Sequence, residues 1–273
     1  MTILMDLKKR LLKVRYLRHP YLIARVILRP LEIWDSKRHN FRLNEYERYS
    51  VLLEEAVETL TGCPKPAITE LVKELYGSGL LQYLHTRLQQ ADDVGGPVDY
   101  ESGTVLYVLV RIFKPEVVVE TGVANGVPSS FILKALDQNS RGKLYSIDLH
   151  YREGISVPVG KALGWIIPEE LRNRWLLVLG ESTKVLPKLL KKLGTVDIFF
   201  HDSRHTYKTM MKEYSIVWPF LKDGGLLLSH DIKSNDAFLD FVDRIKAKPI
   251  IISNIGVAHK TSCNVKPKFT ARA

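Results

Sequence analysis

The sequence predicts an α/β protein with a doubly wound, seven-stranded, mostly parallel sheet that ends in an antiparallel hairpin, preceded by a helical extension. Three observations predict this class. Apolar segments alternate with helical segments between residues 102 and 246, as in parallel sheets with helices on both faces. The apolar segments are uninterrupted, which is typical of strands covered on both sides. The last two follow each other too closely for a parallel crossover and must form a hairpin.

Each element is predicted from a short run of the sequence. The expected strands cover residues 117–120, 143–148, 175–180, 196–201, 225–230, 249–253 and 255–260. The expected helices cover residues 102–113, 127–136, 160–173, 182–193, 206–221 and 237–246. The tetrapeptide from Lys222 to Gly225 is predicted to be the turn before the fifth strand.

Residues 44–90 are predicted to be helical, because leucines and valines recur at helical spacing among glutamates. Pro64, Pro66 and the Gly77–Gly79 segment interrupt this pattern. Residues 92–97 hold two aspartates, two glycines and a proline, and we interpret them as a linker. The predicted organisation is a basic helical extension over 1–95, a main domain over 96–262 and a basic tail over 263–273.

The beginning of the chain carries much of the positive charge. The 273 residues include 40 basic and 30 acidic side chains, with a formal net charge of +10. Residues 1–48 contain twelve of the basic and five of the acidic ones. Residues 11–34 alternate basic and apolar side chains and are interrupted near Pro20 and Pro30, so they resemble a basic amphipathic helix. Three roles are open: packing within a monomer or homodimer, contact of residues 1–34 with an anionic membrane, and binding of nucleic acid phosphates.

Three further features indicate the cellular setting. The two cysteines, Cys63 and Cys263, fit neither a zinc nor a redox spacing. The sequence contains no run of 18 apolar residues, so it predicts no membrane-spanning helix. The first ten residues lack the apolar core of a signal peptide. We therefore expect a reduced cytoplasmic protein, peripheral at the membrane if the basic segment binds lipid.

A glycine-containing loop follows the first strand of the main domain. Glu120 ends that strand, and Gly122 and Gly126 let a ligand approach the backbone before the next helix. The dinucleotide fingerprint Gly-x-Gly-x-x-Gly is absent, and an acidic residue here suits a cationic ligand. Asp148 ends the second strand, where a carboxylate can accept both ribose hydroxyls. Together they predict a nucleoside with a positive group, S-adenosylmethionine (SAM).

Residues 100–260 resemble a class I SAM-dependent methyltransferase with a Rossmann-like fold. The segments 196–207 and 218–231 resemble the methyltransferase 24 branch of small-molecule and sugar O-methyltransferases. This resemblance implies that the methionine end of SAM meets the glycine loop, the ribose meets Asp148, and the adenine borders the third strand. The residues so implied are Glu120, Gly122, Ala124, Gly126, Ser129, Ser130, Asp148, Gly180, Glu181 and Ser182. Ser129 or Ser130 would hold the methionine carboxylate at the helix N-terminus.

Candidate catalytic residues follow the fourth and fifth strands. Asp202 and His205 come after one strand, and His230 and Asp231 after the next. Ligands of open α/β sheets bind in the crevice beyond these strand ends. A hydroxyl acceptor must lose its proton during methyl transfer. We predict His205 as the general base, assisted by Asp202, because an unperturbed histidine pKa of about 6.5 suits proton uptake near neutrality.

The same resemblance implies an alternative, a divalent metal that lowers the pKa of the acceptor hydroxyl. Its ligands would be Asp202, His230 and Asp231. An imidazole ligand disfavours Mg²⁺ and suits Mn²⁺ or another transition ion. Asn235 could supply an oxygen in its place.

The predicted activity is methyl transfer from SAM to a hydroxyl of a small molecule, sugar or glycan. An RNA methyltransferase is an alternative because of the basic segment. Against it, the fourth strand continues as His-Asp-Ser-Arg and lacks the Asn-Pro-Pro-Tyr type of motif. A non-catalytic nucleoside-binding module with a membrane- or polyanion-binding segment is the third alternative.

Overall fold

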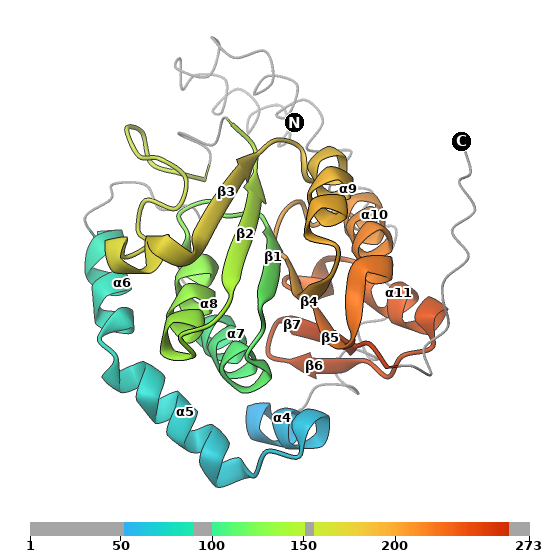
Figure 1. The fold of residues 1–273 in the computed structure, drawn as a ribbon, viewed down its shortest axis with the longest axis horizontal. Helices are drawn as coiled ribbons and strands as arrows, with labels where there is room; N and C mark the ends of the chain where they lie inside the picture. The colour runs from blue at the N-terminus through green and yellow to red at the C-terminus, as the bar shows by residue number, and fades with distance from the viewer. Residues whose placement is uncertain (1–51, 90–99, 151–155, 262–273) are drawn as a thin grey trace, which may run out of the picture.

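The computed structural model describes residues 52–89, 100–150 and 156–261 (Figure 1). Its centre is a seven-stranded sheet with the order β3-β2-β1-β4-β5-β7-β6. The strands are β1 (Val117–Thr121), β2 (Lys143–Asp148), β3 (Trp175–Leu179), β4 (Val196–His201), β5 (Leu221–Ser229), β6 (Ile250–Ile252) and β7 (Ile255–His259). The first five are mutually parallel, and β7 is antiparallel to both β5 and β6. The predicted fold class and its terminal hairpin are confirmed.

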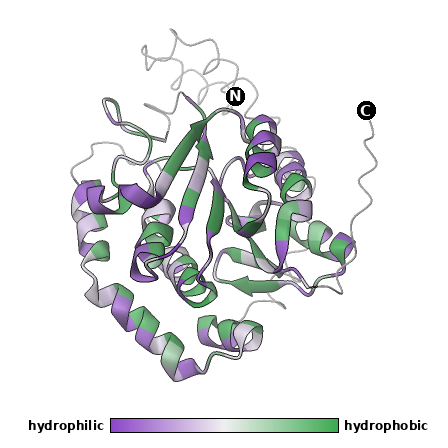
Figure 2. Cartoon of the chain, in the orientation of Figure 1, coloured by the Kyte–Doolittle hydropathy of each residue, from purple (hydrophilic) through white to green (hydrophobic). Residues whose placement is uncertain are grey.

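Helices cover both faces of this sheet and enclose a separate apolar cluster on each. They are α4 (Leu53–Thr61), α5 (Lys65–Gly77), α6 (Leu80–Gln89), α7 (Tyr100–Phe113), α8 (Val127–Gln138), α9 (Ser182–Leu193), α10 (Tyr207–Val217) and α11 (Ala237–Ile245). Successive residues of β1 point to opposite faces, so Val118 packs with α7 and α8 while Val119 packs with α9, α10 and α11. Figure 2 shows the strands mainly in the colour of apolar residues, whereas α5 and α9 carry both colours.

Helices α4, α5 and α6, which precede α7 in the described part of the chain, contribute to the first of these clusters. Ile68, Leu75 and Leu84 are fully buried in it, together with residues of α7 and α8. An ion pair between Glu74 on α5 and Arg111 on α7 (2.7 Å) fixes the same contact. No helix within the described ranges has the length and apolarity needed to cross a bilayer. The predicted linker and the predicted basic helix lie outside the described residues.

The structure corrects two of the predicted helices. Residues 160–173 form turns followed by a short 3₁₀ helix, Glu169–Arg174. Here the amides of Gly164 and Ile166 donate to carbonyls of the glycine loop, at Ala124 and Asn125, instead of to their own helix. The helix predicted over 206–221 ends at Val217, because Pro219 limits continuation to a single 3₁₀ turn.

The predicted turn at 222–225 is also corrected. These residues belong to β5, which begins at Leu221 and has an irregular register opposite β4. Lys260 holds the segment in the sheet, since its backbone exchanges hydrogen bonds with Gly224 and Gly225.

Candidate active site

The predicted site residues gather at one edge of the sheet, where the parallel strands end. Glu120 lies near the end of β1, Asp148 ends β2, and Gly180 follows β3. Asp202 follows β4 and His230 follows β5. Because β1 to β5 are parallel and adjacent in the order given above, these five positions share the carboxyl edge of the sheet.

The glycine loop between β1 and α8 bends sharply and touches the end of β4. Gly122, Ala124 and Gly126 all have positive φ angles, of 88°, 47° and 94°. A Cβ atom on Gly122 would lie 2.0 Å from the carbonyl oxygen of Asp202, so no side chain fits at this position. The Asp202 amide also donates to the Thr121 carbonyl (2.8 Å). The loop predicted to bind the cofactor therefore lies in direct contact with Asp202, which is a predicted catalytic residue.

Asp148 holds the glycine loop in this conformation. Its Oδ2 accepts hydrogen bonds from the amides of Val123 (2.9 Å) and Ala124 (3.0 Å), and its Oδ1 from the amide of Leu149 (2.7 Å). A carboxylate has about four lone-pair sites. Asp148 thus positions the loop, and the role toward a ribose that was predicted for it remains a prediction.

Glu120 is completely buried beneath the loop. Its Oε2 accepts hydrogen bonds from Ser129 (2.7 Å) and Ser146 (2.6 Å), whereas its Oε1 is buried without a hydrogen-bond partner. Burial raises the pKa of Glu120 to about 8, despite these two hydroxyl donors. A cationic ligand group beside Oε1 would favour the ionised form, which agrees with the prediction that the methionine end of SAM lies here.

The remaining predicted cofactor residues have partners within the protein. Ser129 uses its proton on Glu120, and Ser130 donates to the Gly126 carbonyl (2.7 Å). Neither hydroxyl proton is therefore directed at a carboxylate ligand. Glu181 is exposed and pairs with Lys184 (2.7 Å). Gly180 donates its amide to the Asp148 carbonyl (2.8 Å), which joins the ends of β3 and β2.

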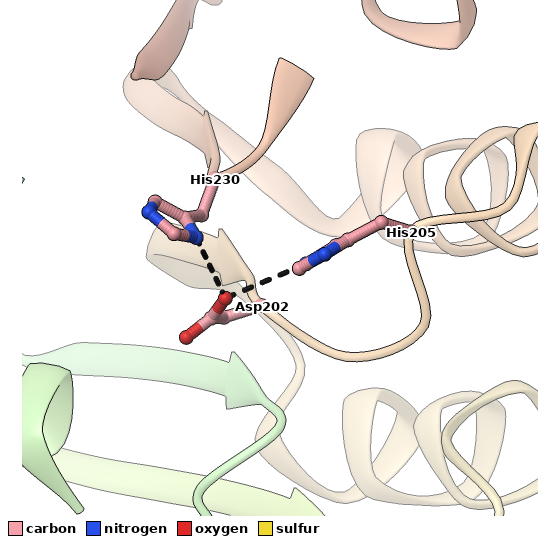
Figure 3. Close-up of side chains that lie close together, drawn as sticks. All are labelled: Asp202, His205 and His230. Atoms are coloured by element: carbon pink, nitrogen blue, oxygen red, sulfur yellow. Dashed lines mark hydrogen bonds and ion pairs between the residues drawn. The ribbon is translucent and has the colours of Figure 1, made fainter. Parts of the chain in front are cut away.

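Asp202, His205 and His230 form a compact cluster (Figure 3). His230 Nδ1 lies 3.0 Å and His205 Nε2 3.4 Å from Asp202 Oδ1. One potential ligand atom from each of the three residues lies within 4.8 Å of the others. About a fifth of each side chain is exposed, so a small molecule or ion can reach the cluster. Two imidazoles and one carboxylate suit a transition ion better than Mg²⁺.

Asp231, the third predicted metal ligand, is not a member of this cluster but contacts both of its histidines. Its Oδ2 is 2.9 Å from His205 Nδ1, and its Oδ1 accepts a hydrogen bond from Asn254 (2.6 Å). The structure therefore groups His205 with Asp202 and His230, and gives Asp231 the contact that orients the His205 ring. Metal-binding histidines commonly donate their second ring N–H to a carboxylate in this way. Asn235 is fully buried, and its side chain donates to the carbonyl of His205 (3.3 Å).

The carboxylates change the protonation of both histidines. Burial alone would lower the pKa of His205, but Asp202 and Asp231 outweigh it and raise the pKa to about 10. The same balance raises the pKa of His230 to about 8. Burial opposes ionisation of Asp202 and Asp231, yet the two histidines lower both carboxyl pKa values. The unperturbed pKa behind the prediction of His205 as a general base does not apply here, because the two carboxylates favour its protonated imidazole.

The sequence did not indicate Glu213. This residue lies at the centre of a second network of side-chain hydrogen bonds, next to the cluster of Asp202, His205 and His230. This residue of α10 is fully buried and 2.7 Å from His201 Nδ1. Burial opposes its ionisation, but the charge of His201 and several hydroxyl donors lower its pKa. Apolar side chains surround it at helical spacing, at Met210, Tyr214 and Val217. One acid within an apolar helix face was the signal available in the sequence.

The sheet order and its antiparallel terminal hairpin are those of the class I SAM-dependent methyltransferase fold. Residues 119–232 match a family model described as a methyltransferase domain, that of the methyltransferase 24 family. This part of the chain is therefore similar to the methyltransferase domain of that family. None of the curated proteins matches the sequence.

Solved structures share this fold at low sequence identity. Cofactor-bound Rv0187 from MTB aligns with a TM-score of 0.51 and 12% identity, over 69% of this chain and 90% of its own. The SAH-bound methyltransferase PaMTH1 from Podospora anserina gives 0.50 and 12%, over 67% and 88%. The O-methyltransferase TomG from Streptomyces achromogenes, involved in tomaymycin synthesis and in complex with SAM, gives 0.50 and 14%, over 67% and 90%.

Proposed function

We propose that this protein transfers the methyl group of SAM to a hydroxyl of a small molecule or glycan. The observation that carries the proposal is the contact between Gly122 and Asp202, which places the glycine loop beside the Asp202–His205–His230 cluster. A bound sulfonium and an acceptor held at the cluster would then be neighbours. Holding two reactants in line accounts for much of the acceleration that such enzymes achieve.

Different residues of the site bind the two reactants, SAM and the acceptor. Glu120 faces the ammonium group of SAM, and the loop from Gly122 to Gly126 lets the cofactor approach the backbone. Asp148 maintains that loop and lies at the strand end that we assign to the ribose. The cluster after β4 and β5 binds the acceptor hydroxyl.

We further propose that a divalent transition ion belongs to the cluster, held by Asp202, His205 and His230. The donor set fits such an ion, since three ligand atoms converge and Asp231 orients one of the rings. The ion would supply a lower pKa for the acceptor hydroxyl. Since His205 has a pKa of about 10 without an ion, its imidazole is unsuited to accept a proton at neutral pH.

A hydroxyl acceptor also fits the observed cluster better than an RNA base does. The polar groups of the cluster beside the glycine loop are the carboxylate of Asp202 and the imidazoles of His205 and His230. Residues 1–34 lie outside the described residues, and their contact with an anionic membrane remains our proposal from sequence. The same holds for a cytoplasmic or membrane-peripheral location and for a homodimer.

The test is an assay of methyl transfer from labelled SAM to phenols, sugars, glycolipids and RNA. We expect a hydroxyl acceptor to be labelled, the activity to be lost in chelator, and Mn²⁺ to restore it. Asp202→Ala should abolish turnover, while Glu74→Gln, remote from the site, should retain it. Labelling of RNA alone would contradict the hydroxyl acceptor. Full activity in chelator would contradict the role of the ion and leave the protein groups as the only activators.

A further inference from the structure

Glu213 links segments that lie far apart in the sequence. Although α10 runs along the surface of the domain, this side chain points inward and is fully buried. Its two oxygens receive hydrogen bonds from four side chains on the segments that end β1, begin α9, end β4 and follow β4. The donors are Thr121, Ser182, His201 and Ser203.

Two of these donors belong to the segments assigned to the cofactor. Thr121 donates to Oε2 (2.6 Å) and lies between Glu120 and the tight contact of Gly122. Ser182 donates to Oε1 and is the first residue of α9, at the edge assigned to the adenine. Glu213 therefore holds the end of β1 and the start of α9 through hydrogen bonds.

The other two partners flank Asp202, the first residue of the cluster of Asp202, His205 and His230, which we call the reaction cluster. His201 Nδ1 is 2.7 Å from Oε2, and Ser203 Oγ donates to Oε1 (2.7 Å). Asp202 lies between them in the sequence. The His201 ring also makes an edge contact with the His205 ring, with centroids 5.4 Å apart. The positions of Asp202 and His205 thus depend on the same buried carboxylate.

We propose that Glu213 is a positioning residue that couples the cofactor-binding segments to the reaction cluster. It touches neither reactant in this scheme and acts through Thr121, Ser182, His201 and Ser203. The proposal rests on the proposed function, because it presumes that SAM binds at the glycine loop. Its consequence is that one residue on α10 controls both cofactor affinity and turnover.

Loss of this carboxylate leaves several buried polar groups without a partner. Thr121 and His201 are fully buried, so their donors cannot exchange Glu213 for water. Such networks stabilise a site when complete and are costly when one member is removed. Glutamine keeps the shape of the side chain but loses the charge beside His201. It should therefore retain part of the positioning that alanine loses.

The experiment compares Glu213→Ala and Glu213→Gln with Glu74→Ala. Glu74 is a matched control, since it also accepts hydrogen bonds from two side chains, Tyr107 and Arg111, but these join α5 to α7 and belong to no segment of the site. SAH affinity is measured by calorimetry, and kcat and acceptor KM by labelled methyl transfer, well below each melting temperature. For Glu213→Ala we expect SAH affinity and kcat each to fall by about tenfold or more, as misplaced groups in active sites do. Glu213→Gln should recover part of both, and Glu74→Ala should change neither.

Two results overturn the inference, and both are distinct from failure of the proposed function. One is wild-type affinity and turnover in Glu213→Ala; the other is an equal loss of both in Glu74→Ala. If the wild-type protein itself binds no SAH, the proposed function fails and this inference fails with it.

Single-hydroxyl variants test the proposal if Glu213→Ala does not fold. Ser182→Ala should weaken SAH binding with little change in kcat, and Ser203→Ala should lower kcat with little change in SAH binding. In the Glu213→Gln background each should have a smaller effect, because neighbours in one network are not additive. Effects that stay the same in both backgrounds would contradict coupling through Glu213.

Discussion

Glu120 is a carboxyl group whose burial reduces the stability of the protein without ligand at high pH. Its pKa rises from an ordinary value of 4.5 to about 8 because burial disfavours its charge. The folded state therefore binds this proton more tightly than the unfolded state. The associated stabilisation is complete below pH 4.5 and is lost as the pH rises through about 8. A bound cation would offset the loss.

Replacing Glu120 with glutamine should separate stability from binding. Glu120→Gln should raise the free energy of unfolding at pH 9 by on the order of 2 kcal/mol and change it little at pH 4.5, since the penalty for charge burial is removed. It should also weaken SAM binding, because the ammonium group loses its carboxylate. Denaturant unfolding at both pH values and calorimetry are the measurements. A variant that is less stable at pH 9 but binds SAM normally would contradict both expectations.

At the scale of elements, α10 connects the reaction cluster to the second network. It begins at Tyr207, two residues after His205, and carries Glu213 about two turns later. Its N-cap is Thr206, whose hydroxyl oxygen accepts a hydrogen bond from the Thr209 amide (3.3 Å). Because Thr206 follows His205 directly, this cap also restrains the position of His205.

Removal of that cap should loosen the start of α10. Thr206→Ala should lower the free energy of unfolding by about 1 kcal/mol, the usual cost of losing an N-cap hydroxyl. Thr206→Ser keeps the hydroxyl and should cost less. Thermal unfolding of the three proteins, with amide exchange at residues 207–210, measures the effect. If the serine variant loses as much as the alanine variant, the hydroxyl is not the stabilising group.

The elements and edge residues were predictable from sequence for a physical reason. Buried parallel strands need uninterrupted apolar runs, and residues that end parallel strands must share an edge. The sequence therefore located Glu120, Asp148 and Asp202. The high pKa of His205 was not predictable, because it depends on Asp231 reaching the second nitrogen of the ring. The prediction of a helix over 160–173 was wrong, because backbone amides of this segment donate hydrogen bonds to the glycine loop.

At the scale of the whole molecule, the helices before the sheet are part of its core. Ile68, Leu75 and Leu84 are fully buried against residues of α7 and α8. The predicted boundary near residue 95 falls among residues 90–99, outside the described ranges, and stays a prediction. The site itself is built from residues 120–254.

Two truncations distinguish the basic segment from these helices. Removal of residues 1–51 should leave SAM affinity unchanged, because no described site residue is lost, and should reduce binding to anionic vesicles at low salt. Removal of residues 1–89 should unfold the domain or lower its melting temperature strongly, since it exposes the apolar cluster. Circular dichroism, SAM titration and vesicle sedimentation report these results. Equal vesicle binding by the full chain and the shorter truncation would contradict the membrane contact.

The most direct test of the account is hydrogen exchange measured by mass spectrometry with and without SAM. We expect SAM to slow amide exchange in the segments at the carboxyl edge of the sheet. These segments are residues 121–126, 148–150 and 180–182. Nicotinamide dinucleotide should not slow exchange there. Exchange that SAM leaves unchanged in all three segments, or protection confined to α4, α5 and α6, would contradict the claim that this edge is the cofactor site of a methyltransferase.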